Sequence, residues 1–227
     1  LDKEYDRSTI YELRYEAANK TYPNPYVLTV ALEFQDKEST PFGRGRSYLR
    51  NTVTYQQRFH YSQERKITAR FFGGVFLHNS NWDSQGFTPE MLTLLPQGYN
   101  DYRYDQLFFG RTDNTGVFSQ QVSQTDGGFK NAFGSNYPVT GLSQRYLLSL
   151  NLRADLPFRL PLGIPLKPYF DLGYFEDAAP SRPFDEKLLW SGGLLLEIFG
   201  GGLEVYFTLV NANPINELYE KRGKGYA

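Results

Sequence analysis

Residues 146–156 read YLLSLNLRADL and decide the fold class of this chain. Apolar side chains fill the even-numbered positions from Tyr146 to Leu156, and apart from Leu147 the odd-numbered positions are polar. An alternation with a period of two is typical of a β-strand, because successive side chains of a strand point to opposite faces of its sheet. The pattern therefore predicts a strand with one apolar face and one polar face.

The same alternation recurs along the chain and predicts an all-β, antiparallel protein. It is clear in residues 26–35 and weaker in the other three N-terminal segments. The eight predicted strands are residues 11–17, 26–35, 49–59, 66–77, 146–156, 166–174, 190–198 and 203–209.

The connections between these strands alternate in length. The short ones are residues 19–25, 62–65, 157–165 and 199–202, and the long ones are residues 36–46, 78–144 and 177–187. Short periplasmic turns and long extracellular loops are typical of outer-membrane β-barrels, whereas a soluble meander has no reason to place every long loop at one end. We therefore expect residues 1–227 to form one transmembrane β-barrel domain of the bacterial outer membrane, with residues 78–144 as a long extracellular loop.

The composition agrees with a sheet that is apolar on one face and wet on the other. Apolar residues make up 40% of the 227 residues and aromatic residues 17%, while the mean hydropathy is −0.52. No stretch is long and apolar enough for a membrane-spanning helix, but barrel strands need only about 9–11 alternating residues. The net charge of −1, without blocks of like charge, argues against a nucleic-acid partner.

Both ends of the predicted barrel need an explanation. With this topology the first strand starts outside the cell and the last strand ends there, whereas barrel chains usually begin and end in the periplasm. Either further strands precede Leu1 and follow Ala227, or terminal segments cross weakly. We expect a longer chain, and we interpret residues 219–226 as a loop that leads into one more strand.

The two faces of the predicted strands differ in what they would contact. The apolar faces would meet lipid, and Tyr26, Tyr61 and Trp190 lie near strand ends, where an aromatic girdle belongs. Acids and bases on the opposite faces are nearly balanced, which predicts paired charges inside a narrow barrel filled by side chains rather than a wide pore. The candidate lumen network is Glu12, Arg14, Glu33, Arg58, Arg70, Arg153, Asp155, Asp171, Glu197 and Glu204.

No motif in the chain marks a catalytic, cofactor-binding or metal site. The sequence contains two histidines, His60 and His78, and no cysteine, so neither a His-Glu-x-x-His zinc motif nor thiolate chemistry is available. Phosphate-binding and serine-hydrolase motifs are also absent. We therefore expect no enzyme activity and no cofactor within these residues.

The long loop is the most informative segment outside the strands. Thr88 as N-cap and Pro89 at the first helical position predict a short helix over residues 89–95. Loops of this length are often functional, so the Tyr- and Arg-rich part is a candidate lid, plug or partner-docking surface. The interpretation we favour is a self-packed external loop with Arg–Asp pairs. The candidate residues are Asp101, Tyr102, Arg103, Tyr104, Asp105 and Arg111.

Several short runs resemble one protein family. They are residues 101–105, 109–111, 126–129, 202–207 and 219–220. Together they resemble the C-terminal membrane-barrel region of large outer-membrane proteins related to M1-type (gluzincin) metallopeptidases, over most of residues 66–226. The resemblance implies an anchor domain joined to a peptidase-like domain upstream of Leu1, and a last strand after residues 219–226. The zinc motif of that family has no match here, so no catalytic residue carries over.

Three functions remain open from the sequence. The first is a membrane anchor or scaffold for a surface peptidase-like domain or a multi-protein outer-membrane complex, with outer-membrane lipid and other surface proteins as partners. The second is a stand-alone outer-membrane channel or transporter. The third is a soluble ligand-binding β-barrel or β-sandwich. The paired interior charges argue against the second, and the asymmetry of the loops argues against the third.

Overall fold

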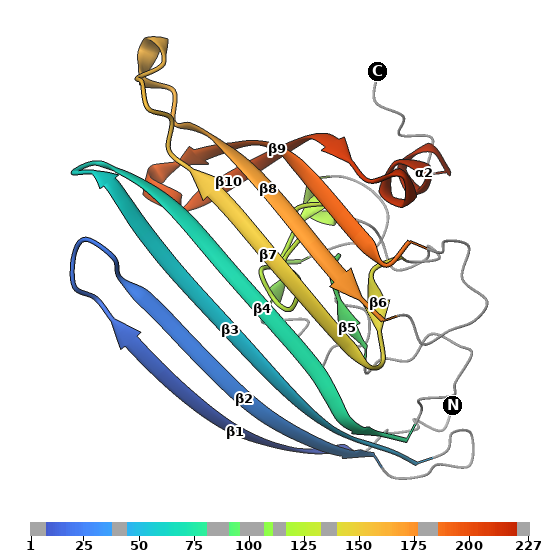
Figure 1. The fold of residues 1–227 in the computed structure, drawn as a ribbon. Coiled ribbons are helices and arrows are strands. Elements are labelled where there is room, and N and C mark those ends of the chain that lie inside the picture. The colour runs from blue at the N-terminus through green and yellow to red at the C-terminus, as the bar shows by residue number, and fades with distance from the viewer. Residues whose placement is uncertain are drawn as a thin grey trace.

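The computed structural model describes residues 8–37, 45–80, 91–95, 107–110, 117–132, 140–176 and 186–221, and its main feature is one curved antiparallel sheet (Figure 1). The strands of this sheet are β1 (Ser8–Asn19), β2 (Tyr26–Lys37), β3 (Arg46–Ser62), β4 (Arg65–Asn79), β7 (Tyr146–Ala154), β8 (Leu166–Phe175), β9 (Leu188–Ile198) and β10 (Leu203–Asn211). The described residues also contain β5 (Leu92–Thr93), β6 (Leu142–Ser143), 3-10 turns at Val117–Gln120, Pro161–Gly163 and Phe199–Gly201, and helix α2 (Asn213–Lys221).

The sheet is a meander of eight strands in the order β1-β2-β3-β4-β7-β8-β9-β10. Each strand pairs with its neighbours in the chain, except that the connection between β4 and β7 leaves the sheet and contains the separate pair β5-β6. In the part of the chain that the structure describes, β1 and β10 are the outer strands and are not paired with each other. The structure thus shows a curved eight-stranded sheet, and its closure into a barrel is not seen.

The predicted strands are confirmed, but the contrast between short and long connections is weaker than predicted, because residues 155–165 between β7 and β8 outnumber residues 38–45 between β2 and β3. Every predicted strand overlaps an observed one, and several are longer than predicted; residues 49–59, for example, belong to the 17-residue strand β3. The turns β1-β2, β3-β4, β7-β8 and β9-β10 lie at one end of the sheet, which we call the short-turn end (Figure 1). The opposite ends of these strands and α2 lie at the other end of the sheet, which we call the long-connection end.

The helix predicted over residues 89–95 is wrong where the structure describes it. Residues 91–95 contain strand β5, which pairs with β6 through Leu92↔Ser143 and Thr93↔Leu142. The amide of Leu94 also donates to the carbonyl of Gly141 at 2.7 Å. These pairings with a distant segment outweigh the local helix signals, because helix propensity is a weak preference that tertiary contacts routinely override.

The interpretation of residues 219–226 as a loop is also wrong in part, since residues 219–221 belong to α2 and residues 222–226 lie outside the described residues. Pro214 near the start of α2 suits the first turn of a helix. Ile215 and Leu218, three residues apart, are almost fully buried against the sheet and hold the helix there. None of the helices in the described residues is long and apolar enough to cross a membrane.

The two faces of the sheet have the polarity that the alternation predicts. We call the face toward β5 and β6 the inner face and the opposite one the outer face. The outer face exposes large apolar side chains from several strands, among them Phe71, Leu148, Phe170 and Phe207. Aromatic rings pair across neighbouring strands on this face, as in Phe170–Trp190, with ring centroids 6.5 Å apart. The inner face carries most of the charged side chains.

Candidate functional site

Part of the long connection between β4 and β7 lies on the inner face of the sheet (Figure 1). We call residues 91–95 and 117–132 together the inner insert. Its two segments join through backbone hydrogen bonds: the amide of Gly127 donates to the carbonyl of Thr93 at 2.9 Å, and that of Phe129 donates to the carbonyl of Leu94 at 3.0 Å. The inner insert is therefore a folded unit packed on the sheet.

Glycines on the inner face make room for the leucines of the insert. A Cβ atom added at Gly74 of β4 would lie 2.9 Å from both δ-carbons of Leu92, and one added at Gly173 of β8 would overlap the side chain of Leu94. Real Cβ contacts are essentially never this short, so a side chain at either position would force Leu92 or Leu94 to shift. The insert thus fits a glycine-lined surface of the sheet.

An apolar cluster joins the insert, the sheet and α2 at the long-connection end. Leu92, Leu94, Leu95 and Phe129 of the insert are 0% exposed. Burying a leucine or phenylalanine side chain contributes about 1.5–3 kcal/mol, so these four side chains account for a large part of the attachment of the insert. Their partners are Tyr48, Phe72, Phe76, Leu147, Phe175, Leu189, Ala212, Ile215, Leu218 and Tyr219.

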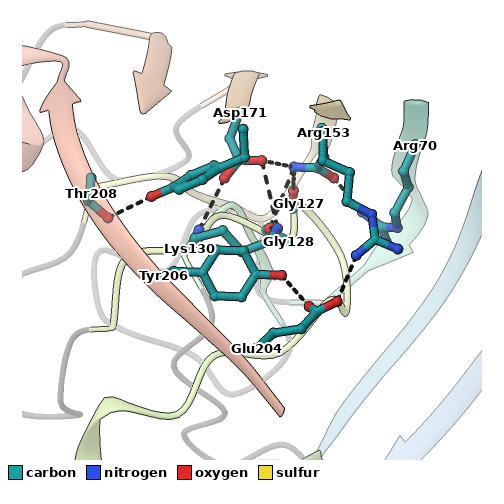
Figure 2. Close-up of polar contacts among 11 residues, drawn as sticks. Arg70, Gly127, Gly128, Lys130, Arg153, Asp171, Glu204, Tyr206 and Thr208 are labelled. Carbon is teal, nitrogen blue, oxygen red and sulfur yellow. Dashed lines mark hydrogen bonds and ion pairs between the residues drawn. The ribbon is translucent and has the colours of Figure 1, made fainter. Parts of the chain in front are cut away.

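A polar cluster joins the insert to the sheet (Figure 2). It lies farther along β7 and β8 toward the short-turn end than Leu147 and Phe175 of the apolar cluster. At its centre Asp171 of β8, 1% exposed, accepts hydrogen bonds from the backbone amide of Lys130 at 3.2 Å and from Nδ2 of Asn151 at 2.8 Å. The ammonium of Lys130 lies 3.7 Å from Oδ1 of Asp171. It also donates to the carbonyl of Gly128. One carboxylate of the sheet therefore binds both the backbone and the side chain of the insert.

Asn151 extends this cluster to neighbouring strands. It donates from Nδ2 to the carbonyl of Gly127 at 3.0 Å, and its Oδ1 accepts a hydrogen bond from Arg70 at 2.9 Å. Arg70 on β4 also stacks on the ring of Phe72, with its guanidinium carbon 5.6 Å from the ring centroid. The insert is thus bonded to side chains of β7 and β8, and through Asn151 to β4.

Burial changes the acid–base character of Lys130, which lies in the insert and outside the strands. Loss of hydration lowers the pKa of its ammonium group, and the nearby carboxylate of Asp171 opposes this change. The same group lies over the ring of Tyr206, 5.6 Å from its centroid. A lysine in such a place needs a partner charge, because an unpaired buried cation is strongly unfavourable.

Further ion pairs surround this centre on the inner face. Arg153 binds Glu204 at 2.7 Å, and Glu204 also accepts a hydrogen bond from the hydroxyl of Tyr206. Tyr169 and Thr208 share a hydrogen bond of 2.8 Å between their hydroxyls. Lys167 forms a separate group of ion pairs. Its Nζ lies 2.9 Å from Oδ1 of Asp155 and 2.8 Å from Oε2 of Glu197. Charges of opposite sign therefore neutralise one another locally.

One cavity separates part of the insert from the sheet. A cavity of about 30 Å³ lies beside Lys130 and is lined in part by Gln56, Arg70, Gln124 and Tyr206. This volume suits one or two water molecules, since a water needs about 10–15 Å³ of such space. The cavity can therefore hydrate the polar cluster.

The structure places the ten residues of the candidate lumen network in several locations. Arg70, Arg153, Asp155, Asp171, Glu197 and Glu204 come together in the polar region just described. Glu33 lies apart from them, buried against Arg50 at 2.9 Å. Glu12, Arg14 and Arg58 are exposed, and the first two are 3.8 Å apart. The six candidate residues in residues 101–105 and at position 111 lie outside the described residues.

Two important side chains, Lys130 and Lys167, were missed in the sequence. Lys167 alternates with Leu166 and Pro168, so its position on the polar face of a predicted strand could have revealed it. Lys130 lies in an irregular segment, where no periodicity indicates which way a side chain points. Only the folding of the insert onto the sheet brings Lys130 to Asp171.

Within the described residues no group of three His, Asp or Glu side chains is placed to hold a metal ion. No protein-family model, curated protein or solved structure matches this chain. The role of the site is therefore inferred from its own side chains. Charges of opposite sign and amide groups hold the insert against the sheet.

Proposed function

We propose that this chain forms part of a bacterial outer-membrane β-barrel that serves as a membrane anchor or scaffold. The observation that carries the proposal is the distribution of polarity over the sheet. Exposed apolar and aromatic side chains cover the outer face, while charged pairs and the insert occupy the inner face. A sheet in lipid needs this arrangement, because its outer side chains contact hydrocarbon and its polar groups must be satisfied inside.

The inner insert favours an anchor over the alternative of a stand-alone channel or transporter. Leu94 and Phe129 have no exposed surface, and the space beside Lys130 is the size of a water molecule or two. A conducting barrel needs a continuous aqueous path between its two ends. The resemblance of the sequence to barrel regions of M1-type peptidase-related proteins supports a surface peptidase-like domain, or a larger outer-membrane complex, as the partner.

The proposal places one requirement on the edges of the sheet. In lipid, backbone N–H and C=O groups at the edges of β1 and β10 would each cost several kcal/mol if they stayed unpaired. The two outer strands must therefore pair with each other or with further strands in the membrane-bound protein. The acids and bases of β1 would then also face an enclosed interior.

Cell fractionation and gel mobility test the membrane assignment. We expect the protein in the outer-membrane fraction, soluble only with detergent, and with an electrophoretic mobility that changes on boiling because a closed barrel resists unfolding by detergent. Reconstituted into planar bilayers, it should show no stepwise conductance. A soluble protein without a mobility shift would overturn the membrane assignment, and regular conductance steps would support the channel instead.

A charged substitution on the outer face tests whether lipid or water surrounds this face. Phe71 lies in the middle of β4 and is 41% exposed. If lipid surrounds it, the Phe71→Arg variant should lose about 2–4 kcal/mol of folding free energy in bilayers. In water an exposed substitution usually changes stability by less than about 0.5 kcal/mol.

The Phe158→Arg variant is the matched control for Phe71→Arg. Phe158 lies in the β7-β8 connection, where it is 59% exposed and outside the strands. We expect this control to have the same folding free energy as the parent protein in bilayers and in water. Equal, small effects of the two substitutions on urea unfolding in lipid vesicles would contradict a lipid-facing outer surface.

A further inference from the structure

The inner insert is attached to the sheet by two surfaces of different chemistry. Leu92, Leu94 and Phe129 pack in the apolar cluster at the long-connection end. Nearer the short-turn end the attachment is polar and runs through Lys130 and the carbonyls of Gly127 and Gly128. Apolar packing tolerates small shifts, whereas a buried charge is strongly destabilising without its partner. We therefore expect the polar attachment to be more sensitive to a single substitution than the apolar one.

Asp171 holds this polar surface together, and the strand that carries it does not need its side chain. The backbone of β8 is paired on both sides, with Asp171 opposite Asn151 of β7 and opposite Ser191 of β9. Within the described residues, in contrast, the segment 117–132 forms backbone–backbone hydrogen bonds to Thr93 and Leu94 of the insert, and it reaches the sheet through hydrogen bonds that involve side chains. Loss of the Asp171 charge should therefore affect the segment more than the sheet.

Removing one charge of this pair has a different consequence from removing both. A single neutral substitution leaves the other charge buried without its counter-ion, which is strongly destabilising. Replacing both charges by neutral groups of similar size is often nearly neutral, because neither desolvation cost remains. The other charged and titratable groups that act on Lys130 are Arg70, Arg153 and Glu204, and two of these already pair with each other.

We propose that the Lys130–Asp171 ion pair is a latch that keeps residues 117–132 seated on the inner face, and that loss of either charge releases this segment while the sheet stays assembled. Release would uncover the polar cluster and enlarge the space beside it. The latch concerns the contact between insert and sheet and does not depend on whether the outer face meets lipid or water. It can therefore fail or succeed independently of the membrane assignment.

The absence of cysteine allows a single reporter to test the latch. Ser123 lies in the segment and is 7% exposed, so a Ser123→Cys variant should react slowly with a water-soluble maleimide. We expect Lys130→Met and Asp171→Asn, each added to this background, to increase the labelling rate on the order of a hundredfold. The double substitution Lys130→Met/Asp171→Asn should return the rate to within about threefold of the parent.

Three controls keep the outcome interpretable. A cysteine at the exposed turn residue Thr21 should label equally fast in every variant. Arg159→Met removes one partner of an exposed ion pair with Glu64 at 3.0 Å and should leave the Ser123→Cys rate unchanged. Circular dichroism should show the sheet intact in both single variants.

Three results would overturn the latch. The first is slow labelling in both single variants. The second is fast labelling in the double variant, which would mean that contacts other than the charge pair hold the segment. The third is loss of the sheet signal in a single variant, since the pair would then support the whole fold and not the segment alone.

Discussion

The Gly74→Leu variant is expected to lose about 3 kcal/mol of unfolding free energy, whereas Gly73→Leu should lose less than 1 kcal/mol. The two glycines are neighbours on β4 and differ in the face that they occupy. A side chain at Gly74 would collide with Leu92, which has no exposed surface and packs in the apolar cluster. A side chain at Gly73 would meet Leu148 on the exposed outer face, with a first contact of 3.3 Å.

This comparison isolates the fit of the insert from the properties of the strand. Glycine in a strand is less favourable than other residues, so both substitutions gain the same backbone preference. The difference between them therefore measures the cost of displacing Leu92. Denaturant unfolding in detergent, followed by intrinsic fluorescence, gives both free energies.

A compensating substitution strengthens the test. In the double variant Gly74→Leu/Leu92→Gly the leucine side chain is moved from the insert to the sheet, so the total volume of the core is conserved. Swaps that keep core volume are tolerated best, and we expect at least half of the lost free energy to return. Equal losses in Gly74→Leu and Gly73→Leu, or no recovery in the swap, would show that the sheet is not shaped for the insert.

The second large effect is expected at the β9-β10 pair. Gly193 lies opposite Thr208, next to the bulge between Thr208 and Val210. A Cβ atom there would overlap the backbone carbonyl of Phe207. The Gly193→Ala variant should therefore force β10 away from β9 and lose about 3 kcal/mol or more, because a backbone atom cannot rotate aside as a side chain can.

Separation of β10 would extend beyond the strand itself. The amide of Ala212 donates to the carbonyl of Trp190 at 2.8 Å and leads the chain into α2, which packs in the apolar cluster. Asn211 at the end of β10 accepts a hydrogen bond from Asn131 of the insert at 3.0 Å. The variant should thus loosen α2 and the insert together, and faster proteolysis near the C-terminus would report it.

Gly192→Ala is the matched control for Gly193→Ala. Its Cβ would lie 3.2 Å from the ring of Phe170 and 3.3 Å from the carbonyl of Tyr169, on the outer face. These contacts are tight but need shifts of only a few tenths of an ångström, so we expect a loss below about 1 kcal/mol. If the two alanine variants unfold at the same denaturant concentration, the close approach of β10 to Gly193 is not required for stability.

The eight strands and the polarity of their faces could be predicted because both depend on local sequence. A period of two, as in residues 146–156, assigns each side chain to one face without knowledge of its neighbours. Antiparallel pairing of successive strands then places alternate connections at the same end of the sheet. Strand ends were less well predicted, as β3 shows, because pairing continues for as long as a neighbour supplies hydrogen bonds.

Residues 91–95 and 219–221 show where local reasoning failed. The first segment has helix signals but pairs as β5 with β6, and the second was interpreted as a loop but belongs to α2. In both cases burial against the sheet decides the conformation: Leu92 and Leu94 fit over glycines, and Leu218 packs in the apolar cluster. Local signals of a few tenths of a kcal/mol per residue cannot compete with such packing.

The sequence by itself therefore determined a sheet with one apolar and one charged face, together with most of the acids and bases of the inner surface. The tertiary structure alone decided which charges meet. Asp171 could be assigned to the inner face from its strand, but its partner Lys130 comes from an irregular segment 41 residues earlier in the chain. Alternation fixes the direction of a side chain within a strand, whereas the path of a loop depends on the shape of the surface that it packs against.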